Sequence, residues 1–354
     1  MVITVVMKAF YLMNVVFQAD NLKQQSISKK GEIKVKKTKK IVICSFIAML
    51  LTLNCKIITK AAKVPSTKKI MAVVKGGEDT IKIKGANIQA IKFKSLNPKI
   101  AAVNKSGKVK AKNIGSCEIK IIVSYRKHRK DSKTLKKELK KEIRVVRPDE
   151  VKSLKKIIKY QNKTDSRLPE DISNSVYTWD KMTGRLVGIE WQRVHLKGKV
   201  SFSKFPALKK LYFFESSVTS VDLSKNVELR ELNCRFSQLK KLDLSKNGKL
   251  RILYCQNNKI SNLTLCKNSK LEIVNCNYNK IKTLDLSNAK NLKVLYCMGN
   301  QLTKLDLTND KKLFELNCKW NKLKILDLST IPEFFRCYAD MDVEIIKPDK
   351  DAEV

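Results

Sequence analysis

The feature that most constrains this chain is a 21-residue repeat in its C-terminal half. The repeated units share the pattern L-x-x-L-x-C-x-x-N-x-[IL]-x-x-L-x-L-[ST]-x-N. A unit of this length cannot close a hydrophobic core alone, so successive units must stack and share one. The sequence therefore predicts a solenoid. Its marker cysteines are Cys234, Cys255, Cys276, Cys297 and Cys318.

Within each unit, the alternation of Leu232 and Cys234 has the period of a β-strand and predicts that both side chains face the core. Parallel stacking would then place equivalent residues about 4.8 Å apart from one turn to the next. The conserved position after each strand carries an amide that can satisfy backbone groups at the buried turn. These residues are Asn258, Asn279, Asn300 and Asn321, with Ser216 and Ser237 in the first two units.

The second half of each unit reads L-D-L-S and predicts a second short strand on the opposite side of the solenoid. Its aspartates should then point outward, where turn geometry explains a regular row of carboxylates. One unit departs from the pattern, with Thr264 and Cys266 in place of Asp and Ser. The aspartates are Asp243, Asp285, Asp306 and Asp327.

This pattern resembles the leucine-rich-repeat family, in particular bacterial surface proteins of the internalin-like type, over residues 186–338. The resemblance implies a solenoid that recognises a ligand. The first unit is degenerate, with Phe213 in place of the cysteine. We expect the last unit to end near Cys337, with the cysteine spacing shortened to 19 residues.

Residues 63–147 read as short β-segments. They contain S-L-N-P-K-I-A-A-V at residues 95–103 and G-K-V-K-A at residues 107–111. These motifs resemble the bacterial immunoglobulin-like group 2 domain, which implies a β-sandwich that serves as a spacer or adhesive module. The family's usual tryptophan is absent, and Phe93 can take its place. The predicted fold class is therefore mainly β, with a small immunoglobulin-like β-sandwich before the solenoid.

An N-terminal cap is expected at residues 148–204. Residues 149–163 form an amphipathic pattern with Val151, Leu154, Ile157 and Ile158 on one face. A helix followed by Trp179 and a G-R-L-V-G-I strand resembles the cap of extracellular leucine-rich repeats. Such a cap covers the open end of the core, so we expect Trp179 and Trp191 to pack rather than bind ligand. The solenoid would occupy residues 205–340 and a C-terminal tail residues 341–354.

Residues 1–62 are interpreted as a leader. KVKKTKK at residues 34–40 precedes 13 uncharged residues, 41–53, which is the order of a secretory signal and too short for a membrane span. Cleavage is expected near Ala61. The alternatives are a buried core helix and a lipidated Cys55, and residues 1–33 are either an extended leader or a misassigned start. The predicted localisation is extracellular, secreted or cell-wall associated.

No enzyme motif is present. The sequence contains no P-loop, dinucleotide fingerprint, H-E-x-x-H or G-x-S-x-G, and its only histidines are His128 and His195. The cysteine column lacks the C-x-x-C pairs of zinc sites, and parallel side chains on adjacent turns point alike rather than at each other. We therefore predict no catalytic residue, no metal site and no cofactor, and we expect the cysteines to be buried and reduced.

The charge is strongly basic, with 74 Lys and Arg against 33 Asp and Glu and a formal net charge of +41. Residues 63–147 carry 25 Lys and Arg against six Asp and Glu. Such a charge favours anionic partners such as cell-wall polymers. A basic insertion is the candidate contact, and the alternative, which the charge run favours, is a solvated hairpin tip. Its candidate residues are Arg126, Lys127, Arg129, Lys130, Lys136, Lys137, Lys140 and Lys141.

Two rows of side chains are candidates for ligand binding on the main strand side. The strand row is the residue between the conserved Leu and Cys: Tyr212, Asn233, Tyr254, Asn275, Tyr296 and Asn317. The turn row lies two residues after the Cys: Phe236, Asn257, Tyr278, Gly299 and Trp320. Aromatics alternate in antiphase between the rows, and either steric fit or ligand binding explains this. Aromatics on alternate turns should lie about 9.6 Å apart.

Two functions fit these features. The first is a secreted or surface recognition and adhesion protein that binds protein or glycan through the solenoid, without enzymatic activity. The second is a structural protein of the cell wall, held by charge on anionic polymers. A non-catalytic fragment of a longer surface enzyme is a third reading. No specific nucleic acid and no membrane span in the mature chain are expected.

Overall fold

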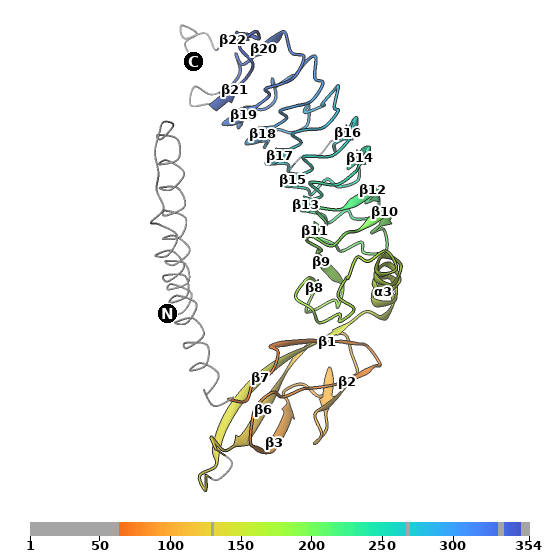
Figure 1. The fold of residues 1–354 in the computed structure, drawn as a ribbon, viewed down its shortest axis with the longest axis vertical. Helices are drawn as coiled ribbons and strands as arrows, with labels where there is room; N and C mark the ends of the chain where they lie inside the picture. The colour runs from red at the N-terminus through yellow and green to blue at the C-terminus, as the bar shows by residue number, and fades with distance from the viewer. Residues whose placement is uncertain (1–63, 129–130, 267–269, 332–335, 348–354) are drawn as a thin grey trace, which may run out of the picture. The chain divides into compact units, whose positions relative to one another are not determined.

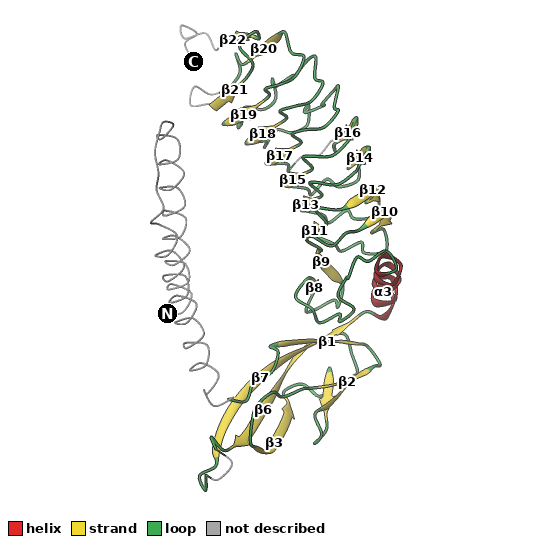
Figure 2. Cartoon of the chain, in the orientation of Figure 1, coloured by secondary structure: helices red, strands yellow, loops and turns green. Residues whose placement is uncertain are grey.

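The computed structural model describes residues 64–128, 131–266, 270–331 and 336–347 (Figure 1). The predicted signal segment and cleavage site lie outside these residues, as do Arg129 and Lys130. The described chain is mainly β, with one α-helix followed by the coils of a solenoid (Figure 2).

Residues 64–147 form two sheets around a core of their own. One sheet has the order β1-β7-β6-β3 and the other β2-β5-β4. Phe93 packs at the edge of this core, and its ring lies against Gly107. The assignment to the immunoglobulin-like family stays a prediction. The strands are β1 (Ile70–Val74), β2 (Glu78–Thr80), β3 (Ile88–Ser95), β4 (Ala101–Val103), β5 (Lys108–Ala111), β6 (Gly115–Tyr125) and β7 (Leu135–Val146).

The C-terminal part of the basic insertion, residues 135–141, belongs to a strand rather than to a hairpin tip. Strand β7 begins at Leu135 and pairs along its length with β6, so only residues 126–134 connect them. Because side chains alternate along a strand, Lys137 and Lys141 share the inner face with Leu139 and Ile143. Lys141 is only 4% exposed, and its Nζ donates to the carbonyl of Lys68 at 2.9 Å.

Helix α3 (Pro148–Asn162) covers the N-terminal end of the solenoid core. Val151, Leu154 and Ile158 are buried in that core, as the amphipathic pattern predicts. Glu150 is also buried: its Oε2 accepts from the backbone N–H of Leu186 at 2.6 Å and its Oε1 from Arg185 at 3.1 Å.

The two tryptophans of the cap are packed, as expected. Trp179 donates its indole N–H to the carbonyl of Ile172 at 2.9 Å, and Trp191 meets Tyr177 edge to face. Both are almost fully buried. The indole N–H groups of both tryptophans thus find hydrogen-bond partners within the cap, Ile172 for Trp179 and the Tyr177 hydroxyl for Trp191.

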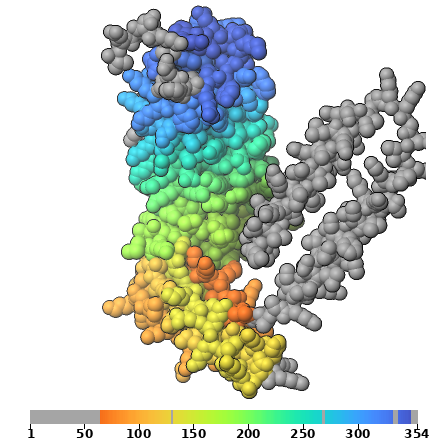
Figure 3. Space-filling model, turned by 90° about the vertical axis from the view of Figure 1, so that its left-hand side faces the viewer, coloured from red at the N-terminus to blue at the C-terminus, as the bar shows by residue number. Residues whose placement is uncertain are grey.

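The solenoid is built on a nine-stranded sheet, in which every neighbouring pair from β9 to β21 is parallel. Successive turns appear as bands from green to blue in Figure 3. The predicted strand over each L-x-C segment is confirmed. The strands are β8 (Tyr177–Trp179), β9 (Leu186–Glu190), β11 (Lys210–Tyr212), β13 (Glu231–Asn233), β15 (Ile252–Tyr254), β17 (Ile273–Asn275), β18 (Val294–Tyr296), β19 (Glu315–Asn317) and β21 (Arg336–Tyr338).

The opposite side carries short two-stranded sheets, which only partly match the expected second strand. Residues 283–285 and 304–306 are not in strands. The aspartates point outward as expected, and each accepts a hydrogen bond from the N–H two residues on, for example Asp285 from Ser287 at 2.9 Å. These strands are β10 (Lys197–Ser201), β12 (Ser217–Asp222), β14 (Lys241–Asp243), β16 (Asn262–Thr264), β20 (Ile325–Asp327) and β22 (Glu344–Ile346).

Two internal rows of side chains stabilise the turns, as predicted: the cysteine ladder, made of the five marker cysteines, and the asparagine ladder, made of Asn258, Asn279, Asn300 and Asn321. The five marker cysteines are buried in one continuous core with the leucines. Asn279 spans two turns: its Oδ1 accepts from the N–H of Ile260 at 2.9 Å, and its Nδ2 donates to the carbonyls of Cys255 and Cys276, both at 3.0 Å. In the first units, where shorter side chains take this position, the hydroxyls of Ser216 and Ser237 form a hydrogen bond of 2.8 Å with each other.

The last turn keeps the 21-residue spacing, so the expectation of a shortened unit is wrong. Cys337 pairs with Leu316 and Tyr338 with Asn317. Cys337 therefore occupies the leucine position rather than the cysteine position. Strand β22 also lies within the segment expected to be a tail, and it pairs with β20.

Candidate functional site

The strand row lies along the main sheet in one register. Tyr212, Asn233 and Tyr254 are aligned on successive strands, and the same register continues to Asn317. It extends one turn further than the sequence indicated, because Tyr338 follows Asn317. The alternation of tyrosine and asparagine therefore runs over seven turns of the sheet.

Two strand-row tyrosines are held by glutamates of the next strand. Tyr212 donates its hydroxyl to Glu231 at 2.7 Å, and Tyr296 donates to Glu315 at 2.8 Å. Burial together with the Glu231 carboxylate raises the pKa of Tyr212, and the Glu315 hydrogen bond raises the pKa of Tyr296. Both hydroxyls are therefore already engaged within the solenoid.

The asparagines of this row are also engaged. The Oδ1 of Asn275 accepts a hydrogen bond from the N–H of Asn277 at 3.2 Å. The Oδ1 of Asn317 accepts one from the N–H of Lys319 at 3.3 Å. Asn233 is buried, so it cannot serve as an exposed ligand contact as the sequence had indicated. Five side chains of the strand row are therefore hydrogen-bonded within the solenoid, whereas Tyr338 at its end is 46% exposed. The five are Tyr212, Asn233, Asn275, Tyr296 and Asn317.

The turn row presents its aromatics to solvent. Phe236 is 49% exposed, Tyr278 42% and Trp320 61%. All three adopt a left-handed backbone, with φ of 50°, 55° and 59°. This conformation costs non-glycine residues about 1–2 kcal/mol and is an outlier for bulky side chains. Asn257 and Gly299, the other members of the row, are residue types that suit it.

Tyr278 and Trp320 form an aromatic pair across an intervening turn. Their ring centroids are 6.1 Å apart and their planes are inclined at 56°. The expected separation of about 9.6 Å for alternate turns is therefore wrong for this pair. Gly299 explains the difference, because a Cβ at this position would lie 2.8 Å from Cδ1 of Tyr278. Without that side chain, the Tyr278 ring leans over Gly299 towards Trp320.

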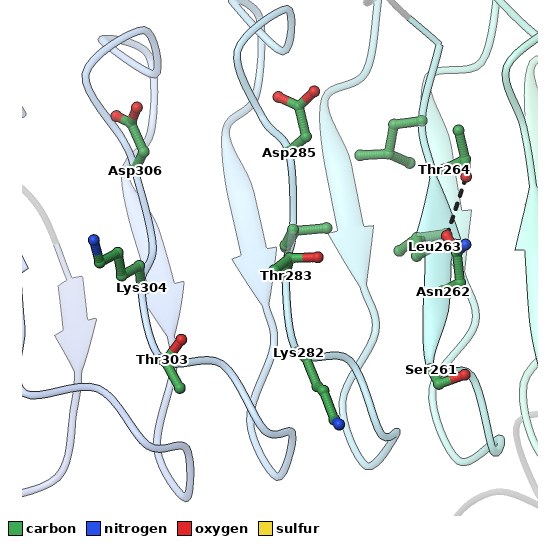
Figure 4. Close-up of a pocket in the computed structure, with 12 residues that line it drawn as sticks. Ser261, Asn262, Leu263, Thr264, Lys282, Thr283, Asp285, Thr303, Lys304 and Asp306 are labelled. Atoms are coloured by element: carbon green, nitrogen blue, oxygen red, sulfur yellow. Dashed lines mark hydrogen bonds between the residues drawn. The ribbon is translucent and has the colours of Figure 1, made fainter.

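A groove of about 750 Å³ lies on the opposite side of the solenoid (Figure 4). It is lined by the same few positions of three successive turns, including Ser261, Lys282 and Thr303. Asp306 accepts from both the N–H and the hydroxyl of Thr308, and these bonds lower its pKa. The groove's two carboxylates, Asp285 and Asp306, thus both accept hydrogen bonds within their own turns.

A basic surface lies on the outer face of the β1-β7-β6-β3 sheet. Lys94, Lys120 and Lys140 are direct cross-strand neighbours on β3, β6 and β7. Like charges directly opposite each other destabilise a sheet. Glu138 and Glu118 form ion pairs with Lys120 and Lys140, at 2.8 Å and 3.3 Å.

The predicted polyanion contacts separate on the two faces of this sheet. Lys136 and Lys140 are exposed, whereas Lys141 is buried on the inner face and cannot take part. Arg126 is half-buried and Lys127 is exposed in the loop after β6. Sequence reasoning missed Lys94 and Lys120, because only the register of strand pairing brings them beside Lys140.

Within the described residues, no three or more His, Cys, Asp and Glu side chains are grouped to hold a metal ion. The same part of the chain has no helix with the length and apolar character needed to cross a membrane. The thiols of the five marker cysteines are buried in the core, which raises the pKa of Cys276 to about 12 and holds that of Cys255 well above its usual value.

Comparison with known proteins finds no matching family model and no matching curated protein. Solved structures similar to the chain include the functional domain of InlJ from Listeria monocytogenes, which includes a cysteine ladder. That match has 26% identity over 46% of this chain and 41% of that chain, with a TM-score of 0.39. The leucine-rich repeat domain of APL1B matches at 21% identity over 51% of this chain and 54% of that one, with a TM-score of 0.39.

A plant ice-binding protein is also similar, at 17% identity over 58% of this chain and 79% of that one, with a TM-score of 0.40. The chain thus spans less than two thirds of the InlJ and APL1B chains it matches. The chain folds as a β-solenoid with a 21-residue turn, and leucine-rich-repeat proteins are among its structural neighbours.

Proposed function

We propose that this chain is a secreted or cell-surface recognition protein that binds its ligand through the turn row of the solenoid, without enzymatic activity. It would belong to the internalin-like leucine-rich-repeat proteins and carry a bacterial immunoglobulin-like module as a spacer. The basic segment and apolar run of residues 34–53 support secretion.

The observation that carries this proposal is the placement of three aromatics in a strained and exposed position. Steric alternation explains why large and small residues alternate between turns. It does not explain why Phe236, Tyr278 and Trp320 occupy a left-handed position that Asn257 and Gly299 fill at lower cost. Strained residues held by a rigid scaffold are typical of functional sites, and exposed aromatics are typical anchors of binding surfaces.

The test is adhesion of the labelled full-length chain to isolated bacterial cell walls and to epithelial cell monolayers. Changing Phe236, Tyr278 and Trp320 together to Ser should abolish the adhesion that the unaltered chain shows. A matched control changes Tyr212, Tyr254 and Tyr296 to Ser in the strand row. Equal adhesion of the folded turn-row variant and the unaltered chain would refute the proposal.

The second candidate is attachment to anionic wall polymers by charge. The cross-strand row Lys94, Lys120 and Lys140 favours it, because the sheet keeps three adjacent like charges on an exposed face. Binding of this kind would weaken with salt, since exposed charges are screened over about 8 Å at physiological ionic strength.

A further inference from the structure

We propose that Tyr278 and Trp320 form a subsite for a linear β-1,4-linked polysaccharide that runs along the turn row. This inference rests on the proposed function and names the class of its ligand. It begins from the aromatic pair, whose rings lie 6.1 Å apart over a glycine that leaves room for them. Both side chains are partly exposed, and their ring planes are inclined to each other.

The polar groups around the pair are suited to sugar hydroxyls. Among the described residues, neither the hydroxyl of Tyr278 nor the indole N–H of Trp320 has a hydrogen-bond partner. The side-chain amide of Asn257, one turn before Tyr278, is likewise without a partner in this part of the chain. Ring faces together with free donors and acceptors match a pyranose, which has an apolar C–H face and a rim of hydroxyls.

The geometry of the row favours a linear polymer over a protein surface. The row is one residue wide, and the strand row beside it is bonded to itself through Tyr212–Glu231 and Tyr296–Glu315. A stable protein interface needs roughly 800 Å² on each partner. Phe236 and Tyr278 are two turns apart, about 9.6 Å along the sheet, which is close to the length of a disaccharide in a β-1,4-linked chain.

β-1,4 linkage is preferred because it keeps the chain extended, with equatorial substituents and flat C–H faces. A polymer of this kind can meet residues on successive turns without curving away from the solenoid. An α-1,4-linked chain of the same sugars curves, so it cannot follow Phe236, Tyr278 and Trp320 together.

Trp320 provides a direct readout, because Trp179 and Trp191, the other two tryptophans, are buried in the cap. Acrylamide quenching of the full-length chain should therefore report mainly on Trp320, and Trp320→Phe supplies the baseline. The probes are hexasaccharides of β-1,4-linked N-acetylglucosamine, β-1,4-linked glucose and α-1,4-linked glucose. We expect a β-1,4-linked hexasaccharide to protect Trp320 from quenching and the α-1,4-linked one to leave it unprotected.

Two variants place the effect at the pair. Tyr278→Ser should weaken binding of the β-1,4-linked probe about tenfold or more, whereas the control Tyr254→Ser should bind like the unaltered chain. Gly299→Ala keeps both aromatics but pushes a methyl group into the Tyr278 ring, so it should also weaken binding. Circular dichroism and thermal melting check that each variant is folded.

Failure to bind either β-1,4-linked probe would overturn the inference, as would equal binding of the α-1,4-linked probe or undiminished binding by folded Tyr278→Ser. These results are distinguishable from failure of the proposed function. If the probes do not bind but cell adhesion still requires Phe236, Tyr278 and Trp320, the turn row is a recognition surface for another ligand.

Discussion

Asp310 occupies the same column of the solenoid that Asn247 occupies three turns earlier, but it lacks the hydrogen bonds of that column. Asn247 donates its Nδ2 to the carbonyls of Leu223 and Asn226, at 3.2 Å and 2.8 Å. Asp310 is fully buried, and within the described residues neither carboxylate oxygen has a partner. An ionised carboxylate cannot donate hydrogen bonds to such carbonyls. Burial disfavours the ionised form and raises the pKa of Asp310 to about 7.

Asp310→Asn should therefore stabilise the solenoid, and the gain should depend on pH. The folded chain retains a proton on Asp310 that the unfolded chain releases above its ordinary pKa of 3.8. The contribution of Asp310 to stability is thus greatest below pH 3.8 and falls as pH rises to about 7, by roughly 4 kcal/mol. Urea unfolding of both proteins from pH 4 to pH 8 should show a difference that grows over this range.

The control for this prediction is Asp306→Asn. Asp306 is exposed, and hydrogen bonds from Thr308 lower its pKa, so its effect has the opposite sign: it favours folding once ionised. A constant difference between Asp310→Asn and the unaltered chain across the pH range would contradict the assignment of a buried, protonated Asp310.

Asn279→Ala should destabilise the solenoid by about 2–3 kcal/mol. The side chain makes hydrogen bonds to Ile260, Cys255 and Cys276, each worth about 1 kcal/mol, and its removal leaves buried backbone groups unpaired. Asn262→Ala changes an exposed amide on the opposite side and should cost less than 0.5 kcal/mol. Chemical denaturation gives the free energy of unfolding of the two variants. Equal losses for Asn279→Ala and Asn262→Ala would mean that the asparagine ladder does not stabilise the turns.

The cysteine ladder should resist a bulky thiol reagent. The thiolate is the reactive form, and burial raises the pKa of Cys255, Cys276 and Cys297. Cys266 and Cys337 are only partly buried and should be modified first. Peptide mapping after labelling of the native chain gives the order, and fast labelling throughout the ladder would show that the core is open.

Cys276→Ser tests the packing role of the same ladder. It places a hydroxyl in an apolar position, which should destabilise the chain by about 1–3 kcal/mol. Cys266→Ser, at a partly exposed site where other units carry Ser or Thr, is the matched control and should be near neutral. If both substitutions cost the same, the ladder cysteines do not act as core residues.

The repeat made the solenoid predictable because each position of the unit has one environment, repeated at every turn. The inward Leu and Cys, the asparagine ladder and the outward aspartates all followed from periodicity. Alignment by residue type sets Cys337 against Cys318 and so predicts a shortened last turn, which is wrong. Spacing alone places Cys337 with Leu316, and would also have identified Tyr338 as the end of the strand row.

The candidate site was less predictable, because exposure and backbone conformation are not visible in a pattern of letters. The two aromatic rows look equivalent in the sequence, yet Tyr296 is bonded to Glu315 while Trp320 is exposed. The lean of Tyr278 over Gly299 depends on contacts between turns. Likewise, Lys141 faces the core only because β7 begins early enough to include it.

The lysine row on the β-domain should control salt-sensitive binding to anionic polymers. Changing Lys94, Lys120 and Lys140 to Gln removes three adjacent charges, and we expect weaker binding to inorganic polyphosphate at low salt, with a shallower dependence on salt concentration. The substitutions relieve like-charge repulsion but also remove the exposed ion pairs with Glu138 and Glu118, so we expect little net change in the stability of the domain. The matched control changes Lys240, Lys282 and Lys324 to Gln, three exposed lysines of the solenoid that lower the net charge equally. If both triple variants lose the same affinity, overall charge rather than the row binds the polymer, and attachment through this sheet face is refuted.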